Sequence, residues 1–482
     1  MNFRSVFHLI SYLILFLSGA IALSGLAGWG WGDDGAVVAK MLLSALIVLF
    51  PGLLALWLTR GASDLSRKDG FAIVTLGWLI LAHAGALPYL ITGVIPNPVD
   101  ALFETMSGFT TTGSTIITDI EILPRGVIFW RSMTQWMGGM GVLLMCVAIL
   151  PFLGVGGMQL YRAEMPGPSK DRLTPRIANT AKLLWGVYVL LTLAETGALM
   201  LAGMTFFDAI NHSLCTMATG GFSPHNASIA HFDSPAISLI ISFFMLLAGI
   251  NFALHYRALR GDLKSYWRSP EVRFFFGIIA VATLLISIDL IVHMGFGTGQ
   301  SLLAALFQVI SIITTTGFAT EDYDLWPLFS KTLLFMLLFS GGCAGSTAGG
   351  IKLMRTLVVL KECGRQIRLF MQPQAVLKIR MGQQTVQSNI VSGISAFYLC
   401  FFMLFIVFTL LMALLTPDLQ TAASSVIACM GNVGPGFSAV GPTANFASIP
   451  WPGKILLSFA MLLGRLELFT VLVLFSPGFW KK

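Results

Sequence analysis

The sequence predicts an all-α integral membrane protein with two leading transmembrane helices. Four parallel helix–pore loop–helix repeats are expected to follow, with pseudo-fourfold symmetry around one central pore. Of the 482 residues, 56% are hydrophobic and only 11% are charged, and the mean hydropathy is +0.82. A soluble domain carries roughly 25% charged residues, so most of this chain is expected to lie in a bilayer. Four similar windows also lie between pairs of apolar segments.

The apolar segments set the expected order of elements. Segments of about 20 residues, enough for a helix to cross a bilayer, are expected near 7–27, 38–59, 71–93, 126–150, 182–204, 236–256, 272–295, 393–415 and 453–475. One further segment, 328–361, is interrupted. The first segment resembles a cleavable signal, but we expect a retained helix, because its removal would leave an odd number of spans. The expected units are 1–62 (two leading helices), 63–162, 163–262, 263–380 (with a broken second helix) and 381–482.

The four windows are 100–113, 208–221, 304–317 and 421–434. Each has alanine at its second position and ends in glycine, and each is too short to cross a bilayer. A single window could be an ordinary helix that ends at a glycine. Four windows in register, each framed by two apolar segments, favour re-entrant pore loops instead.

Each window ends in three residues, here called the loop triplet. A turn at the end of a short helix can aim backbone carbonyls at a dehydrated cation. The backbone torsions of such a turn are resisted by a residue with a Cβ, and glycine adopts them readily. The four triplets are Thr111-Thr112-Gly113, Thr219-Gly220-Gly221, Thr315-Thr316-Gly317 and Asn432-Val433-Gly434. Potassium channel filters carry a second glycine two residues later, and here only Gly436 of the fourth loop keeps it. We therefore expect fewer ion sites than in a potassium channel filter, and weak discrimination between similar cations.

The interrupted segment contains a glycine-rich stretch, 340–350, with five glycines in eleven residues. Each costs a helix about 1 kcal/mol relative to alanine, and irregular backbone at membrane depth must be covered by protein or line a cavity. We interpret the stretch as an intramembrane gate rather than a packing seam, with Gly345, Ser346, Thr347, Gly349 and Gly350 as gate residues.

Several charged residues lie inside apolar segments, where charge is costly and usually functional. Arg465 is interpreted as an electrostatic barrier in the pore, and the alternative is a pair with Glu467 or Glu195. Arg131 and Asp289 are expected to be structurally paired near the ends of their segments.

Charge is distributed unevenly along the chain. Most of the 29 Lys and Arg residues lie in 60–68, 162–182, 257–273 and 352–380, while the alternate connections are acidic or neutral. Basic loops face the cytoplasm, so we expect both termini to be cytoplasmic and the loop triplets to open outward. This pattern predicts a lipid bilayer as partner and no nucleic acid.

The sequence shows no sign of an enzyme. It lacks a P-loop, a nucleophile elbow, an H-E-x-x-H motif and a CxxC pair, and no expected helix carries a convincing set of metal ligands.

The chain resembles the TrkH/TrkG family of bacterial potassium uptake proteins over essentially its whole length. The resemblance rests on the four windows, on GVGGMQLYRAEMPGP at 154–168, on FDAINHSLCTMATGGFSPHNASIAHFDSP at 207–235, on GGCAGSTAGG at 341–350 and on GRLELFTVLVLFSPGFW at 464–480. Two departures are Ala348 where the family usually has glycine, and Gly431-Asn432-Val433-Gly434 where it has Asn-Asn-Leu-Gly.

The resemblance implies potassium uptake across the bacterial inner membrane. It also implies a homodimer in which each protomer has its own pore, and a cytoplasmic nucleotide-binding regulatory subunit similar to TrkA. It makes 341–350 the gate and Arg465 the cation that guards it. Sodium-preferring plant relatives carry serine at the position of Gly113, so this glycine favours potassium; a sodium or mixed-cation transporter of the same fold stays open as the alternative.

Overall fold

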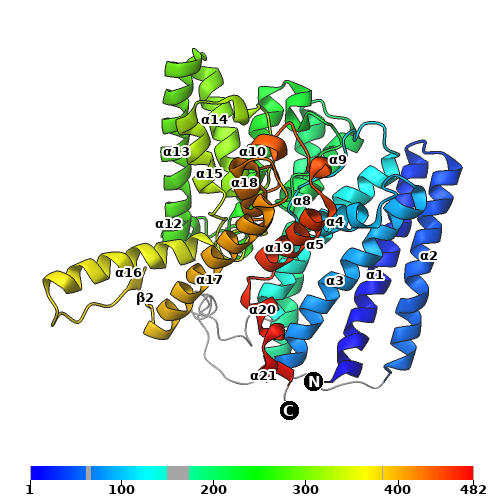
Figure 1. The fold of residues 1–482 in the computed structure, drawn as a ribbon, viewed down its shortest axis with the longest axis horizontal. Helices are drawn as coiled ribbons and strands as arrows, with labels where there is room; N and C mark the ends of the chain where they lie inside the picture. Colours follow the sequence, from blue (N-terminus) through cyan, green and yellow to red (C-terminus); the bar gives the residue numbers. More distant parts are fainter. Residues whose placement is uncertain (1, 61–66, 149–172, 383, 481–482) are drawn as a thin grey trace.

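The computed structural model describes residues 2–60, 67–148, 173–382 and 384–480, which are predominantly helical (Figure 1). The α-helices are α1 (Phe3–Gly30), α2 (Gly35–Leu58), α3 (Arg67–Thr92), α4 (Pro98–Phe109), α5 (Arg125–Ala148), α8 (Leu173–Leu201), α9 (Phe206–Met217), α10 (Pro235–Gly249), α11 (Phe252–Leu259), α12 (Lys264–Arg268), α13 (Pro270–Met294), α14 (Thr298–Ile313), α15 (Leu328–Leu337), α16 (Leu353–Met371), α17 (Ser388–Ala413), α18 (Leu419–Met430), α19 (Trp451–Arg465), α20 (Phe469–Leu472) and α21 (Pro477–Trp480).

Short elements complete the described chain. The 3-10 turns are η1 (Ser228–Phe232), η2 (Tyr323–Leu325), η3 (Ser438–Val440), η4 (Phe446–Ser448) and η5 (Val473–Phe475). Strands β1 (Arg380–Met381) and β2 (Gln384–Thr385) form an antiparallel pair in which Arg380 lies opposite Thr385. The motif at 154–168 lies outside the described residues.

Six helices in the described part of the chain are long and apolar enough to cross a membrane, and eight are if each of two bent helix pairs counts as one span. The six are α1, α2, α3, α8, α13 and α17. Their outward faces carry large apolar side chains such as Leu46, Leu284 and Leu410, each at least 60% exposed. In a soluble protein such faces would be costly to hydrate, whereas lipid accepts them. The chain is therefore a multi-pass membrane protein.

Each of the four windows contains a short helix: α4, α9, α14 and α18. Three of these helices begin at a side-chain cap, because Asn97, Thr205 and Asp418 each accept a hydrogen bond from a backbone N–H of the first turn. The helices are largely buried among the longer ones. Their C-terminal ends, which carry the negative end of the helix dipole, lead into the loop triplets.

Two segments that we expected to be continuous spans are broken. Segment 236–256 divides into α10 and α11, with a bend of 104° between them. Segment 453–475 divides into α19 and the stretch Phe469–Phe475, with a bend of 108°. The first break follows Gly249, and Asn251 accepts a hydrogen bond from Ala253 N–H to begin α11. The second includes Glu467 and Leu468, both in the left-handed region with φ of 59° and 51°. Hydropathy does not reveal such breaks, since apolar residues continue on both sides.

The polar stretch near 362–392 contains regular secondary structure. Helix α16 continues to Met371, and the β1–β2 pair returns the chain to α17. Figure 1 shows α16 extending away from the helical bundle, while α1 and α2 lie at the opposite edge.

One contact between distant segments supports a stability prediction. Asp33, between α1 and α2, accepts hydrogen bonds from the backbone N–H groups of Arg125 and Gly126 at 2.8 and 2.7 Å, so it caps α5. Asp33→Ala is expected to destabilise the fold by about 0.5–2 kcal/mol, measured as a lower thermal unfolding midpoint in detergent. The neighbouring Asp34 makes no side-chain cap, and Asp34→Ala is the matched control. Equal midpoints for the two variants would contradict the capping role.

Candidate ion pore

The four loop triplets share one backbone conformation. Their first residues are in the left-handed region, with φ of 50° at Thr111, 53° at Thr219, 58° at Thr315 and 52° at Asn432, and their closing glycines have φ from 80° to 101°. The middle residue's N–H donates to a carbonyl five residues earlier in every case, at 2.8–2.9 Å. The sequence differs among the triplets, but their geometry does not.

The triplets lie side by side in a closed ring. A Cβ built on Gly113 would lie 2.2 Å from the carbonyl oxygen of Gly220, and one on Gly221 would lie 2.0 Å from that of Thr316. The same construction places Gly317 against Val433 at 2.0 Å and Gly434 against Thr112 at 2.7 Å. Each loop thus contacts the next one in chain order, and the fourth contacts the first. Only a residue without a side chain fits at the closing positions.

The carbonyl groups of the middle residues are mostly without donors. In the described part of the chain, no hydrogen-bond donor reaches the carbonyl oxygen of Thr112, Thr316 or Val433. That of Gly220 accepts from Gln135 Nε2 at 2.6 Å. Buried carbonyls are nearly always paired, so unpaired ones in a ring are a feature that a cation would satisfy.

Gln135 of α5 is a residue that the sequence analysis missed. Its Oε1 also accepts from Phe222 N–H at 3.1 Å, so its amide holds both sides of the second triplet. A Cβ on Gly220 would lie 2.3 Å from the Gln135 side chain. This explains why the middle position is glycine only in the second triplet. The sequence did contain a signal for it, because Gln135 is a polar amide inside an apolar segment, four residues after Arg131.

A pocket opens on one side of the ring. All four closing glycines line it, together with Arg131 and Ser223. Arg131 is buried, as expected for a paired residue: its Nε lies 2.6 Å from Glu104 Oε1 and its Nη1 donates to Ser223 O at 3.0 Å. Glu104 in turn accepts from Thr115 Oγ1 and Ile116 N–H. The buried pair ties the first pore helix to the segments that follow the first and second triplets.

The glycine-rich segment 340–350 lies on the opposite side of the ring. Gly349 N–H donates to Thr315 Oγ1 at 2.6 Å, and Thr347 Oγ1 donates to Met217 O at 2.9 Å. A Cβ on Gly349 would lie 2.4 Å from Gly431 O. Ser346 and Thr347 are fully buried, and Gly345 O accepts from Phe252 N–H at the α10–α11 break. The segment therefore contacts the second, third and fourth repeats directly beneath their triplets.

Arg465 at the end of α19 contacts this segment. Its Nη1 donates to Thr347 O at 2.7 Å and its Nη2 donates to Gly138 O of α5 at 3.3 Å, with the side chain 3% exposed. Of the two alternative partners, Glu467 pairs with Arg355 at 2.5 Å, and the carboxylate of Glu195 has no hydrogen-bond partner in the described residues. Arg465 therefore joins the glycine-rich segment of the third repeat to the first repeat.

Asp289 is another charged residue inside an apolar segment, and its partners are His293 and Ser330. It is 7% exposed, lies 2.9 Å from His293 Nδ1, and accepts from the backbone and hydroxyl of Ser330. It joins α13 to α15, as expected for a structural pair.

Apolar membrane helices around a buried ring of backbone carbonyls are typical of proteins that transport small cations. Comparison with known proteins agrees with this class. The family model TrkH, described as a cation transport protein, matches residues 39–482. The chain is 43% identical over 489 residues to the Trk system potassium uptake protein TrkH of Escherichia coli strain K12, with all of both chains covered. It is 38% identical over 433 residues to TrkG of the same organism, with 88% of each covered.

A solved structure is also similar. The crystal structure of the potassium transporter TrkH from Vibrio parahaemolyticus matches with a TM-score of 0.92 and 39% identity, and all of both chains is covered. The chain belongs to the TrkH family. It is therefore a transport protein and not an enzyme.

Gln135 supplies a test of the second triplet. Gln135→Leu would leave Phe222 N–H unbonded, and a buried unsatisfied group costs about 1–3 kcal/mol. We expect a lower unfolding midpoint and a lower ratio of potassium to sodium flux in proteoliposomes. The control is Gln308→Leu on α14, since both amide atoms of Gln308 are buried without a hydrogen-bond partner in the described residues. If Gln308→Leu lowers the unfolding midpoint and the flux ratio as much as Gln135→Leu does, the specific role of the Gln135 contact is refuted.

Proposed function

We propose that this protein is the ion-permeating subunit of a potassium uptake system, and that its four loop triplets surround one central pore. The observation that carries the proposal is the closed ring of triplets, in which each closing glycine lies against a carbonyl of the next loop. Such a ring can replace the hydration shell of a potassium ion with backbone oxygens. The helix C-termini that lead into the ring add favourable electrostatics for a cation. Potassium is the cargo, held transiently.

Side-chain oxygens support an ion position at the inner edge of the ring. Thr111 Oγ1 and Asn432 Oδ1 are buried, belong to first residues of triplets, and have no hydrogen-bond partner in the described chain. In this proposal they add side-chain oxygens to the unpaired carbonyls of Thr112, Thr316 and Val433. The set of twelve triplet residues is our proposed ion-binding site.

We propose that 340–350 and Arg465 gate this pore. The segment lies across the inner side of the ring and contacts the second, third and fourth repeats. Arg465 bonds it to the remaining repeat, the first, through α5. A positive charge next to the ion path opposes cation passage. Displacement of the segment would break bonds to Thr315 and Met217 at the same time, so gate movement and filter geometry are coupled.

The names of the relatives support one part of the proposed assembly. They are named as members of a Trk system, which supports additional subunits. We propose a homodimer in the bacterial inner membrane, regulated by a cytoplasmic nucleotide-binding subunit similar to TrkA, with both termini cytoplasmic. The first turn of α1 and helix α21 lie at the same end of the molecule, which suits this placement (Figure 1).

The direct test is rubidium or potassium flux into proteoliposomes that hold only this chain. Flux above that of empty vesicles, with reversal potentials that follow the potassium gradient, supports the proposal. Reversal potentials that follow sodium would favour a sodium or mixed-cation transporter, an outcome kept open by Thr115, Ser223 and Ala319 at the positions of a second filter glycine. No flux would contradict both.

Gly113→Ser tests the ring. The added Cβ would meet Gly220 O at a residue with φ of 86°, so the first and second loops must separate. We expect potassium flux to fall about tenfold, equivalent to about 1.4 kcal/mol, and preference to shift toward sodium. The matched control is Gly203→Ser, since Gly203 has φ of 101° with no atom within 4 Å of an added Cβ. Unchanged flux and ion preference in Gly113→Ser would remove the first triplet from the filter.

Arg465→Ala tests the gate. Loss of the guanidinium removes both the charge and the bonds to Thr347 and Gly138, so cation flux is expected to rise about tenfold. Deletions within 341–350 should act in the same direction. Arg465→Lys keeps the charge without the forked geometry of the guanidinium. If the charge is the barrier, the cation flux of this variant should be closer to that of the wild type than the flux of Arg465→Ala. Equal or lower flux in a correctly inserted Arg465→Ala protein would contradict a gating role.

A further inference from the structure

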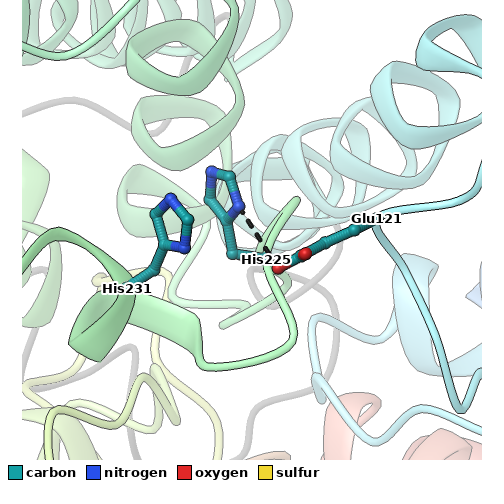
Figure 2. A group of neighbouring side chains, drawn as sticks. All are labelled: Glu121, His225 and His231. Atoms are coloured by element: carbon teal, nitrogen blue, oxygen red, sulfur yellow. Dashed lines mark ion pairs between the residues drawn. The ribbon is translucent and has the colours of Figure 1, made fainter.

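Three potential metal ligands meet outside the ring of triplets. Glu121 lies in the connection between α4 and α5, and His225 and His231 lie in the connection between α9 and α10 (Figure 2). One ligand atom from each lies within 4.8 Å of the others. His225 also lines the pocket that the four closing glycines share. Sequence motifs could not reveal this group, because its members come from two loops a hundred positions apart.

The hydrogen bonds of His225 fix which ring nitrogen is available. Its Nε2 lies 3.0 Å from Asp208 Oδ1, and a carboxylate can only accept, so Nε2 carries the proton. Asp208 therefore accepts a hydrogen bond from His225 and orients its ring, as carboxylates do behind histidine ligands of metals.

The other nitrogen of His225 lacks a partner. Nδ1 is buried without a hydrogen bond and lies 3.6 Å from Glu121 Oε1, as Figure 2 shows. When His225 is neutral, Nδ1 and Glu121 Oε1 each direct a lone pair toward the other. Their separation is too long for a hydrogen bond. Bonds of about 2.0–2.2 Å to a tetrahedral Zn²⁺ ion place neighbouring ligand atoms roughly 3.3–3.6 Å apart. The observed spacing therefore suits two ligands of one ion.

The surrounding loops hold these ligands in place. Asn226 donates from Nδ2 to Asp119 Oδ1 at 2.8 Å and accepts from Ile120 N–H at 2.8 Å, so it fastens the two connections together. His231 stacks on His225 with ring centroids 3.6 Å apart. Because His231 is exposed, its ring can rotate until a nitrogen lone pair points at the shared position.

We propose that Glu121, His225 and His231 bind a divalent transition-metal ion of the zinc class at the outer mouth of the pore. Two imidazoles and one carboxylate suit zinc, nickel or copper better than magnesium or calcium, which prefer all-oxygen sites. Three protein ligands leave a fourth position for water. The ion would link the outer loops of the first and second repeats.

Bound metal has a consequence for transport, and this step rests on the proposed function. A divalent charge beside the pocket would oppose the approach of potassium to the closing glycines. Linked loops would also restrain the segment that leads from Gly221 to His225. External zinc is therefore expected to inhibit uptake.

The binding test uses tag-free, full-length protein in detergent and Co²⁺ as a spectroscopic probe, followed by Zn²⁺ titration. Wild type should take up one Co²⁺ with the strong visible bands of a tetrahedral ion. His231→Ala and Glu121→Gln should each weaken binding about 10–100-fold, the range found when a site loses a supporting group. The matched control is His293→Ala, because His293 is 62% exposed and pairs with Asp289 away from this site; its affinity should equal that of the wild type. Equal affinity in His231→Ala and the wild type overturns the site.

A flux assay then tests the consequence, with zinc added only outside proteoliposomes and each variant compared with its own metal-free flux. Zinc should inhibit the wild type and His293→Ala, and His231→Ala should need at least about tenfold more zinc for the same inhibition. Inhibition that is equal in all three proteins contradicts a block at this site. Absence of metal-free flux would count against the proposed function alone, since metal binding is measured separately.

Discussion

The contact between each closing glycine and a carbonyl of the next loop is the constraint on which the remaining structure depends. Four such contacts close a ring only if all four loops have the same depth, the same turn and no Cβ at the closing position. Each first residue must then adopt left-handed torsions, at a cost of about 1–2 kcal/mol for a residue with a side chain. The strain is held by hydrogen bonds that return the triplet N–H groups to α4, α9, α14 and α18, and in the proposed pore the triplet carbonyls then face the cation.

A symmetric ring is supported by unequal neighbours. Gln135 fills the space beside Gly220 that a side chain at this middle position would need. In the fourth triplet Asn432 replaces threonine, and its Nδ2 donates to Thr112 Oγ1 at 3.0 Å, which joins the last loop to the first. Beneath the ring, only the third repeat supplies the glycine-rich segment and only the fourth supplies Arg465. In the proposed pore, selectivity rests on what the loops share, and regulation rests on what they do not.

Much of the architecture could be predicted, because it depends on local signals. Apolar length revealed the long helices, alanine and glycine spacing revealed the four windows, and the motifs at 207–235 and 464–480 revealed the family. The breaks at Gly249 and after Arg465 could not be predicted, because hydropathy does not change across them. The roles of Gln135 and Asn432 depend on contacts between distant segments, and single-sequence patterns do not contain such distances.

The histidine cluster was missed for the same reason. Metal-ligand motifs in a sequence are recognised by ligands spaced closely along one segment, whereas Glu121 and His231 come from loops of different repeats. Arg131 shows the opposite case: an intramembrane charge predicts a partner, although Glu104 itself could only be identified in the structure.

The most direct test of the central claim is anomalous diffraction or difference density from protein prepared in rubidium instead of potassium. The account predicts a peak on the axis of the ring, bounded by the carbonyl oxygens of Thr112, Gly220, Thr316 and Val433, which disappears in Gly113→Ser. Rubidium density elsewhere in the membrane region, with none inside the ring, would contradict it.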